Sequence, residues 1–170
     1  MGEEFVFRSC GADQLDKILE MEAEALSSLD RPDLLRRNTV EMWSSCLRPP
    51  HLCLGAWAGA ELAGFGVLYV PEKGGAEDLS QLLTRMDARP YSSANYKICI
   101  VRPDWRGHHL QVLLGQRLAA AANARGVNLL CATASPHNTA SVRSLLRLGY
   151  LEDSRVEKYG FERILFYQVN

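Results

Sequence analysis

The sequence lacks a strong excess of charge, and it contains no run of lysine or arginine residues. Its 170 residues carry a formal net charge of −1 at pH 7. Proteins that bind nucleic acid or an anionic membrane through electrostatics carry clustered positive charge, so this composition argues against both kinds of partner. Small molecules and other proteins remain as expected partners.

Long hydrophobic runs are missing as well. No apolar stretch reaches the length of a membrane span, and the start "MGEEFVFRSC" lacks the basic-then-apolar order of a signal peptide. The cysteines are odd in number, show no C-x-x-C spacing and mostly fall in apolar segments: Cys10, Cys46, Cys53, Cys99 and Cys131. We therefore expect reduced cysteines in the core of a cytoplasmic protein.

What the chain has is apolar content: hydrophobic residues make up 47% of it, without internal repeats or low-complexity tracts. A chain of this length and composition can bury a sizeable core, so we expect one domain over residues 1–170. Phe5–Ser9 alternates like a strand, and the apolar spacing from Asp13 to Leu29 predicts a helix whose apolar face is interrupted by Glu22. A second helix is expected from Pro32 to Leu47.

The middle of the chain predicts a hairpin followed by an irregular excursion. Residues 51–70 predict two strands that turn at Ala58–Ala60, where Gly59 permits the required backbone. The segment from Pro71 to Ala94 predicts at most a short helix, from Asp78 to Met86, and is interpreted as a surface insertion.

The second half predicts a strand–helix–strand unit with a right-handed crossover. Its parts are a strand at Asn95–Val101, a helix from Leu110 that stops at Gly126, and a strand at Leu129–Ala134. A short helix that begins near Asn138 and a hairpin that turns at Tyr159 and Gly160 complete the chain.

The stretch "VRPDWRGHHLQVLL" joins the first strand of this unit to its helix. The first N–H groups of a helix lack intrahelical acceptors and lie at the positive end of its dipole, so this turn could hold a phosphate, with Arg106 adding charge. The alternative is a plain surface turn before a helix. A Rossmann dinucleotide loop is not expected, because no G-x-G-x-x-G opens a helix.

The order "ICIV", "RGHHLQ", a second strand and "PHNTASVRSLLRLGY" resembles the GNAT superfamily of N-acetyltransferases over about Asn95 to Tyr150. This resemblance implies an α/β fold, with a mixed central sheet of about seven strands and helices on both faces. It also implies acetyl-CoA as the acyl donor and an amine as the acceptor.

The family's pyrophosphate loop follows R/Q-x-x-G-x-G/A. Carried over by position, the coenzyme-binding loop is Arg106, Gly107, His108, His109, Leu110 and Gln111. Glutamine at the second glycine place also occurs in a bacterial branch that resembles R-G-N-G-L-Q, P-x-N-x-x-S and the later "KYGFERIL". His109 is the departure from the pattern, and its Cβ is expected to crowd the phosphate and to weaken coenzyme binding.

The resemblance implies that backbone groups of Cys99 and Val101 pair with the pantetheine arm, and that the Cys99 N–H faces the thioester carbonyl as an oxyanion donor. Asn138 and Ser141 would lie near the coenzyme, although Asn138 could equally serve only as a helix N-cap. The tyrosine that acts as general acid in the family would fall at Leu145, a position that also fits a plain core residue. Ser144 or an ordered water would then protonate the leaving thiolate.

Other polar residues leave the general base open. Histidine has a suitable pKa, which makes candidates of His51, His108, His109 and His137, whereas no metal site is expected. Tyr91 and Tyr96 could line the site or simply pack. Asp30 and Asp33 could attract a cationic amine or begin the second helix.

Two functions stay open on the sequence. One is an acetyl-CoA-dependent N-acetyltransferase that acts on a small molecule, a peptide or a protein. The other is a GNAT-like binding or regulatory module with weak or no catalysis, suggested by His109 and Leu145. The apolar final strand "ILFYQV" could also pair across a homodimer.

Overall fold

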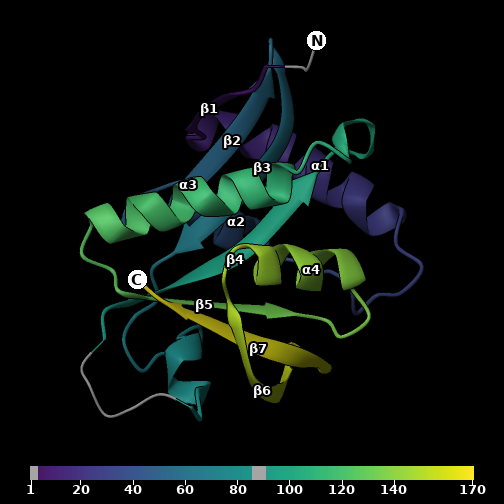
Figure 1. Cartoon of the computed structure of the whole chain (residues 1–170). Helices are drawn as coiled ribbons and strands as arrows, with labels where there is room; N and C mark the ends of the chain where they lie inside the picture. The colour runs from purple at the N-terminus through teal and green to yellow at the C-terminus, as the bar shows by residue number, and fades with distance from the viewer. Residues whose placement is uncertain (1–3, 86–90) are drawn as a thin grey trace.

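A computed structural model describes residues 4–85 and 91–170. Within these residues seven strands form one sheet in the order β1-β2-β3-β4-β5-β7-β6. The strands are β1 Val6–Ser9, β2 Leu52–Ala58, β3 Glu61–Tyr69, β4 Ser93–Val101, β5 Leu129–Ala134, β6 Leu151–Lys158 and β7 Phe161–Val169. The helices are α1 Leu15–Ser27, α2 Val40–Cys46, α3 Leu110–Ala124 and α4 Thr139–Arg147. Helices α3 and α4 cover one face of the sheet, and α1 and α2 cover the other (Figure 1).

The sheet is mixed, because β4 and β5 run parallel and the other neighbouring strands run antiparallel. The expected α/β fold with helices on both faces is therefore confirmed. The core follows from the apolar faces of these elements. Ile18 and Met21 of α1 pack with Trp43 of α2 and Phe65 of β3, and on the other face Leu118 of α3 belongs to a second cluster.

The second helix begins at Val40, so the expectation of a start at Pro32 is wrong. The Thr39 hydroxyl accepts a hydrogen bond from the Met42 N–H at 3.1 Å, which caps the helix there. Just before this cap, the Glu22 carboxylate accepts a hydrogen bond from the Asn38 N–H at 3.0 Å and holds that residue outside the helix. Residues 28–39 consequently form a loop that is available to line a site.

The final strand cannot pair across a dimer, because β7 lies between β5 and β6 and pairs with both. That expectation is wrong, although its hairpin is confirmed. Tyr159 and Gly160 have φ values of 58° and 82°, the left-handed geometry that a two-residue hairpin turn requires.

The excursion between β3 and β4 packs against the sheet through Leu79, which contacts the cluster of Leu129, Cys131 and Leu165. Its expected helix is reduced to a single 3-10 turn at Leu79–Leu82, and the predicted end at Met86 lies outside the described residues. The described part of the segment therefore packs against the core of the domain.

Candidate active site

The parallel strands β4 and β5 separate soon after they meet. They pair only from Ser93 to Asn95, opposite Leu129 to Cys131. From Ala132 onward β5 continues to pair with β7, while among the described residues no strand pairs with this side of β4 beyond Asn95. The sheet therefore opens beside the C-terminal half of β4.

Backbone donors of β4 point into this opening. The Arg102 N–H, just beyond the strand, donates to the Ala63 carbonyl of β3 at 2.8 Å. Backbone groups alternate sides along a strand, so the Ile100 N–H also faces β3, and the N–H groups of Cys99 and Val101 face the opening. These two N–H groups are therefore the donors of β4 that a ligand in the opening could use.

A second set of donors stands at the start of α3. The first intrahelical bond runs from the Leu113 N–H to the His109 carbonyl at 3.0 Å. The N–H groups of Leu110, Gln111 and Val112 consequently have no intrahelical acceptor, and they lie at the positive end of the helix dipole. This is a ready site for an anion.

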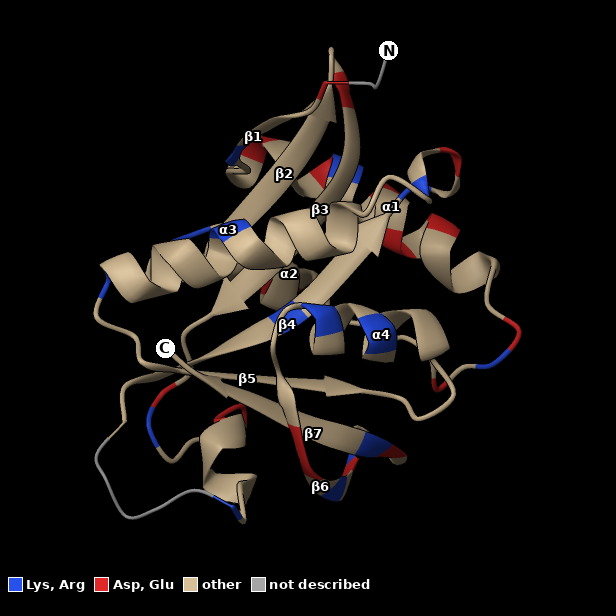
Figure 2. Cartoon of the chain, in the orientation of Figure 1, with Lys and Arg blue, Asp and Glu red and all other residues tan. Residues whose placement is uncertain are grey.

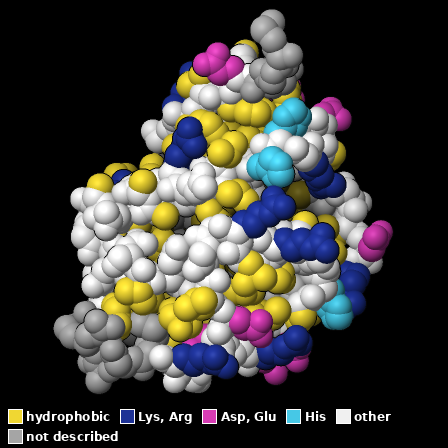
Figure 3. All heavy atoms as spheres, viewed as in Figure 1, with side chains coloured by type: hydrophobic (Ala, Val, Ile, Leu, Met, Phe, Trp, Pro, Cys, Tyr) yellow, Lys and Arg dark blue, Asp and Glu magenta, His cyan; other side chains and the backbone are white. Residues whose placement is uncertain are grey.

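A cleft of about 460 Å³ connects the two sets of donors. It is lined by most of the residues predicted to bind the coenzyme, namely Cys99, Val101, Arg106, Gly107, His109, Leu110, Gln111 and Asn138. Helix α4 carries basic residues (Figure 2), and basic and histidine side chains gather on the face of the molecule drawn in Figure 3. His108 does not line the cleft, because its ring packs against Phe5 and Trp105.

Asn138 caps α4 and links this helix to the loop before α2. Its Oδ1 accepts a hydrogen bond from the Ser141 N–H at 3.2 Å, and its Nδ2 donates to the Leu34 carbonyl at 3.3 Å. The Gln111 side chain donates to the Ser141 hydroxyl at 3.3 Å and ties α3 to α4. Leu145 of α4 is 2% exposed and packs in the core, as its apolar side chain suggests.

A small cavity of about 100 Å³ adjoins the cleft at Cys99 and Gln111. Tyr96 lines it and donates its hydroxyl to the Gln111 carbonyl at 3.0 Å. Tyr91 instead packs with the cluster around Leu79. Burial raises the pKa of the Cys99 thiol to about 12, so the thiol is protonated near neutral pH and is unsuited to carry an acyl group.

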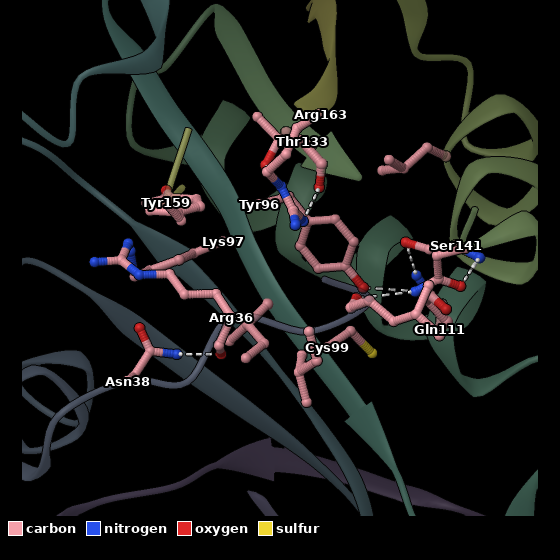
Figure 4. A pocket seen from close by; sticks show the side chains of 16 residues that line it. Arg36, Asn38, Tyr96, Lys97, Cys99, Gln111, Thr133, Ser141, Tyr159 and Arg163 are labelled. Carbon is pink, nitrogen blue, oxygen red and sulfur yellow. Dashed lines mark hydrogen bonds between the residues drawn. The ribbon is translucent and has the colours of Figure 1, made fainter. Parts of the chain in front are cut away.

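Sequence reasoning missed the far wall of this cavity. Figure 4 shows the side chains that form it: Arg36, Lys97, Thr133, Tyr159 and Arg163. The only sequence feature that pointed to this wall was the segment "KYGFERIL", which contains Tyr159 and Arg163. It was used only as part of the resemblance to GNAT proteins and not to predict site residues. Arg36 comes from the loop before α2, so no local pattern connects it with β7.

His51 and Asp33 have structural partners. The His51 Nδ1 accepts a hydrogen bond from the Val70 N–H at 2.9 Å, away from the cleft. The Asp33 carboxylate is held by Arg31 at 2.9 Å, and the structure places no helix start at this residue. Among the described residues no cluster of histidine, cysteine or carboxylate groups could hold a metal ion.

The opened sheet beside a helix start agrees with the comparison of the sequence to known families. Residues 15–150 match the acetyltransferase (GNAT) family. The chain belongs to this family. GNAT proteins use acetyl-CoA as donor, so the protein is an acetyl-CoA-dependent N-acetyltransferase whose acceptor the match does not identify. No curated protein matches the sequence.

Solved structures with this fold come from several bacteria. An N-acetyltransferase of Staphylococcus aureus is 15% identical with a TM-score of 0.73, and the match covers 98% of each chain. The ribosomal-protein-S18-alanine N-acetyltransferase of Escherichia coli is 16% identical with a TM-score of 0.72, over 98% of this chain and 94% of that chain. An acetyltransferase of Salmonella typhimurium, solved with its cofactor acetyl-CoA, is 15% identical with a TM-score of 0.71, over 97% and 93%.

The GNAT loop departs from its usual glycine at His109, yet the backbone there has φ 59° and ψ 26°, which glycine adopts freely. We expect His109→Gly to keep the loop conformation, to remove the Cβ near the phosphate and to tighten acetyl-CoA binding roughly threefold to tenfold, that is by up to about 1.4 kcal/mol. Isothermal titration calorimetry measures this change.

His109→Ala is the matched control, because it removes the ring but retains a Cβ at a positive φ. We expect it to be about 1 kcal/mol less stable than His109→Gly and not to bind more tightly than the wild type. The ring also lies 3.3 Å from the Arg147 guanidinium. Weaker coenzyme binding by His109→Gly would show that this imidazole helps to hold the phosphate.

Proposed function

We propose that the enzyme transfers the acetyl group directly to an amine that enters the opening beside Cys99, without an acyl-enzyme. The observation that carries this proposal is the convergence of two sets of backbone donors on one cleft, at the separation of β4 from β5 and at the start of α3. Main-chain donors are preorganised, so the altered glycines of the loop do not remove them.

In this proposal the N–H groups of Leu110, Gln111 and Val112 would receive the pyrophosphate, with Arg106 at the mouth of the cleft. The backbone of β4 would pair with the pantetheine arm like an added strand, through Cys99 and Val101. When bound, acetyl-CoA supplies an activated thioester. The Cys99 N–H would then donate to the carbonyl oxygen as negative charge develops on it.

The acceptor arrives as an ammonium ion and must lose a proton before it reacts. The neutral nitrogen then forms a bond to the acetyl carbon, and the carbon–sulfur bond breaks. The thiolate takes one proton, so the balanced reaction yields an acetamide, free coenzyme A and one released proton. Ser144 lines the cleft and, with water, is the candidate to supply the proton to sulfur, since Leu145 cannot.

The test combines a thermal melt with a thiol-release assay over a panel of amines. Acetyl-CoA at a hundred times its Kd adds about 2.7 kcal/mol, which should raise the melting temperature by roughly 5 to 11 °C in a chain of this size. Amine-dependent release of thiol would support the enzyme. A shifted melt with no turnover on any amine would favour the binding module, and an unshifted melt at millimolar coenzyme would overturn the cofactor assignment.

We further propose that the enzyme works in the cytoplasm of a bacterium. Five free cysteines support a reducing compartment, because four of them are buried in the core and none is joined in a disulfide among the described residues. Within those residues no helix is both long enough and apolar enough to cross a bilayer.

A further inference from the structure

Arg163 carries a buried positive charge that no carboxylate neutralises. The residue is 8% exposed, and among the described residues it forms no ion pair. Its Nε donates to the Thr133 hydroxyl at 2.8 Å, while longer bonds of 3.4 Å reach the backbone carbonyls of Asp33 and Thr133. A guanidinium has five N–H donors, so these three bonds leave two donors without an acceptor in the part of the chain that the structure describes.

Nearby carboxylates are already engaged. Asp33 is bound through both oxygens by Arg31, at 2.9 and 3.2 Å. Glu77, which the excursion before β4 brings into this region, accepts hydrogen bonds from Arg36 and from Lys97. The positive charge of Arg163 therefore has no carboxylate of its own among the described residues. A buried charge is costly in free energy unless it is paired.

The surroundings of Arg163 also disfavour its charged form. Burial lowers the pKa of its guanidinium, although Tyr159 and Asp33 act in the opposite direction. The Tyr159 ring lies between two cations, with the Arg36 guanidinium carbon 3.8 Å and the Arg163 guanidinium carbon 5.8 Å from its centre. An anion that entered here would meet a preformed basic wall.

Arg163 lines both the inner cavity next to Cys99 and an outer cleft. It lines the cavity of about 100 Å³ that also contains Cys99 and Asn138. It equally lines an outer cleft of about 700 Å³, formed by the loop before α2 and the turn between β6 and β7. Cys99 and Arg163 therefore line one small cavity.

A free acceptor in the same cavity points to a polar occupant. The Asn38 side chain is 8% exposed, and its Oδ1 accepts no hydrogen bond among the described residues. Its Nδ2 donates a hydrogen bond to the Arg36 carbonyl at 3.4 Å (Figure 4). The cavity thus offers unused donors at Arg163, which suit a carboxylate, and an unused acceptor at Asn38, which suits the N–H groups of an amine.

We propose that the acceptor is a small amine that also carries a carboxylate, such as an α-amino acid, and that Arg163 binds this carboxylate while the amine faces the acetyl carbon of the thioester beside Cys99. Because Cys99 and Arg163 line the same small cavity, the amine and the carboxylate are expected to lie near each other in one molecule, and the outer cleft receives the rest of that molecule. This inference rests on the proposed acetyl transfer, because it names the substrate class of the same site.

The test compares a panel of L-amino acids with their carboxamides, which keep the amine but lack the negative charge. Thiol release gives kcat/KM for each pair. We expect the wild type to prefer the acids roughly 10- to 100-fold, the range of one charge-assisted interaction that is lost. Arg163→Met should lose most of this preference, and Arg163→Lys should keep part of it because the charge remains without the planar fork.

Arg155→Met is the matched control, since Arg155 lies in the same hairpin but is exposed and pairs with Glu162. It should leave the acid-to-amide ratio within about twofold. The melting shift with acetyl-CoA checks that each variant is folded and binds coenzyme. If Arg163→Met does not fold, the acid-to-amide ratios of kcat/KM for the wild type and for Arg163→Lys test the inference instead.

Equal rates on acids and amides by the wild type would overturn the carboxylate inference and leave the proposed acetyl transfer intact. An acid preference that Arg163→Met retains would show that another group binds the carboxylate, and it would overturn the role of Arg163. A coenzyme-induced melting shift without turnover on any acid, amide or simple amine would overturn the transfer itself, and the inference with it.

Discussion

Replacement of Cys99 by proline is expected to lower kcat by roughly 100- to 1,000-fold, the usual cost of one lost oxyanion donor. Proline removes the backbone N–H, which is the group that the proposed mechanism uses. The β3–β4 ladder should survive, because this N–H faces the opening and not β3. Single-turnover thiol release with a saturating amine measures the effect on the chemical step.

Two further variants separate the amide from the side chain and from the fold. Cys99→Ala keeps the N–H and removes a thiol that burial keeps protonated, so we expect activity within about threefold of the wild type. Ile100→Pro removes an N–H that faces β3, together with a buried side chain, and should unfold the protein. Equal activity of Cys99→Pro and Cys99→Ala would place the oxyanion donor elsewhere.

The predicted coenzyme side of the site depended on the resemblance to GNAT proteins, because local patterns alone predicted only a strand, a turn and a helix start. The motif that carries this resemblance lies within one continuous stretch, so the residues from Cys99 to Gln111 could be proposed as coenzyme-binding residues before the fold was known. Asn138 could be predicted as an N-cap for the same reason, because capping depends on neighbours within three residues. The conformation of His109 shows why its substitution is tolerated, since histidine is among the residues that adopt positive φ.

The acceptor side could not be predicted in this way. Arg36 and Tyr159 are far apart in the chain, and they meet only because the β6–β7 hairpin folds beside the loop before α2. Glu77 comes from the excursion, whose composition gives no sign that its carboxylate reaches Lys97 of β4. Charges that compensate one another over such separations have no signature in spacing or periodicity.

The loop before α2 also shows where propensity fails. Pro32 favours a helix start, but no helix forms until Val40, because tertiary hydrogen bonds to Glu22 hold the chain in another path. Glu22 was visible in the sequence as a charge on an apolar helix face. The structural role of Glu22 could not be predicted, because both of its hydrogen-bond partners lie in later segments: the Asn38 N–H and the Trp43 Nε1.

Glu22→Ala is therefore expected to destabilise the protein by about 3 kcal/mol, because it leaves two buried donors without an acceptor. The Glu22 Oε2 accepts from the Asn38 N–H at 3.0 Å and from the Trp43 Nε1 at 2.9 Å, and the residue is only 5% exposed. In a chain of this size the loss corresponds to a fall in melting temperature of roughly 6 to 12 °C, measured by calorimetry.

Glu20→Ala on the same helix is the control, since its side chain is exposed and its loss should cost no more than about 0.5 kcal/mol. Glu22→Gln retains an oxygen acceptor and should recover most of the stability. Because Glu22 anchors the loop that lines the outer cleft, Glu22→Ala should also raise KM for the acceptor more than KM for acetyl-CoA. An unchanged melting temperature in Glu22→Ala would show that water satisfies both donors and that this carboxylate does not organise the acceptor side.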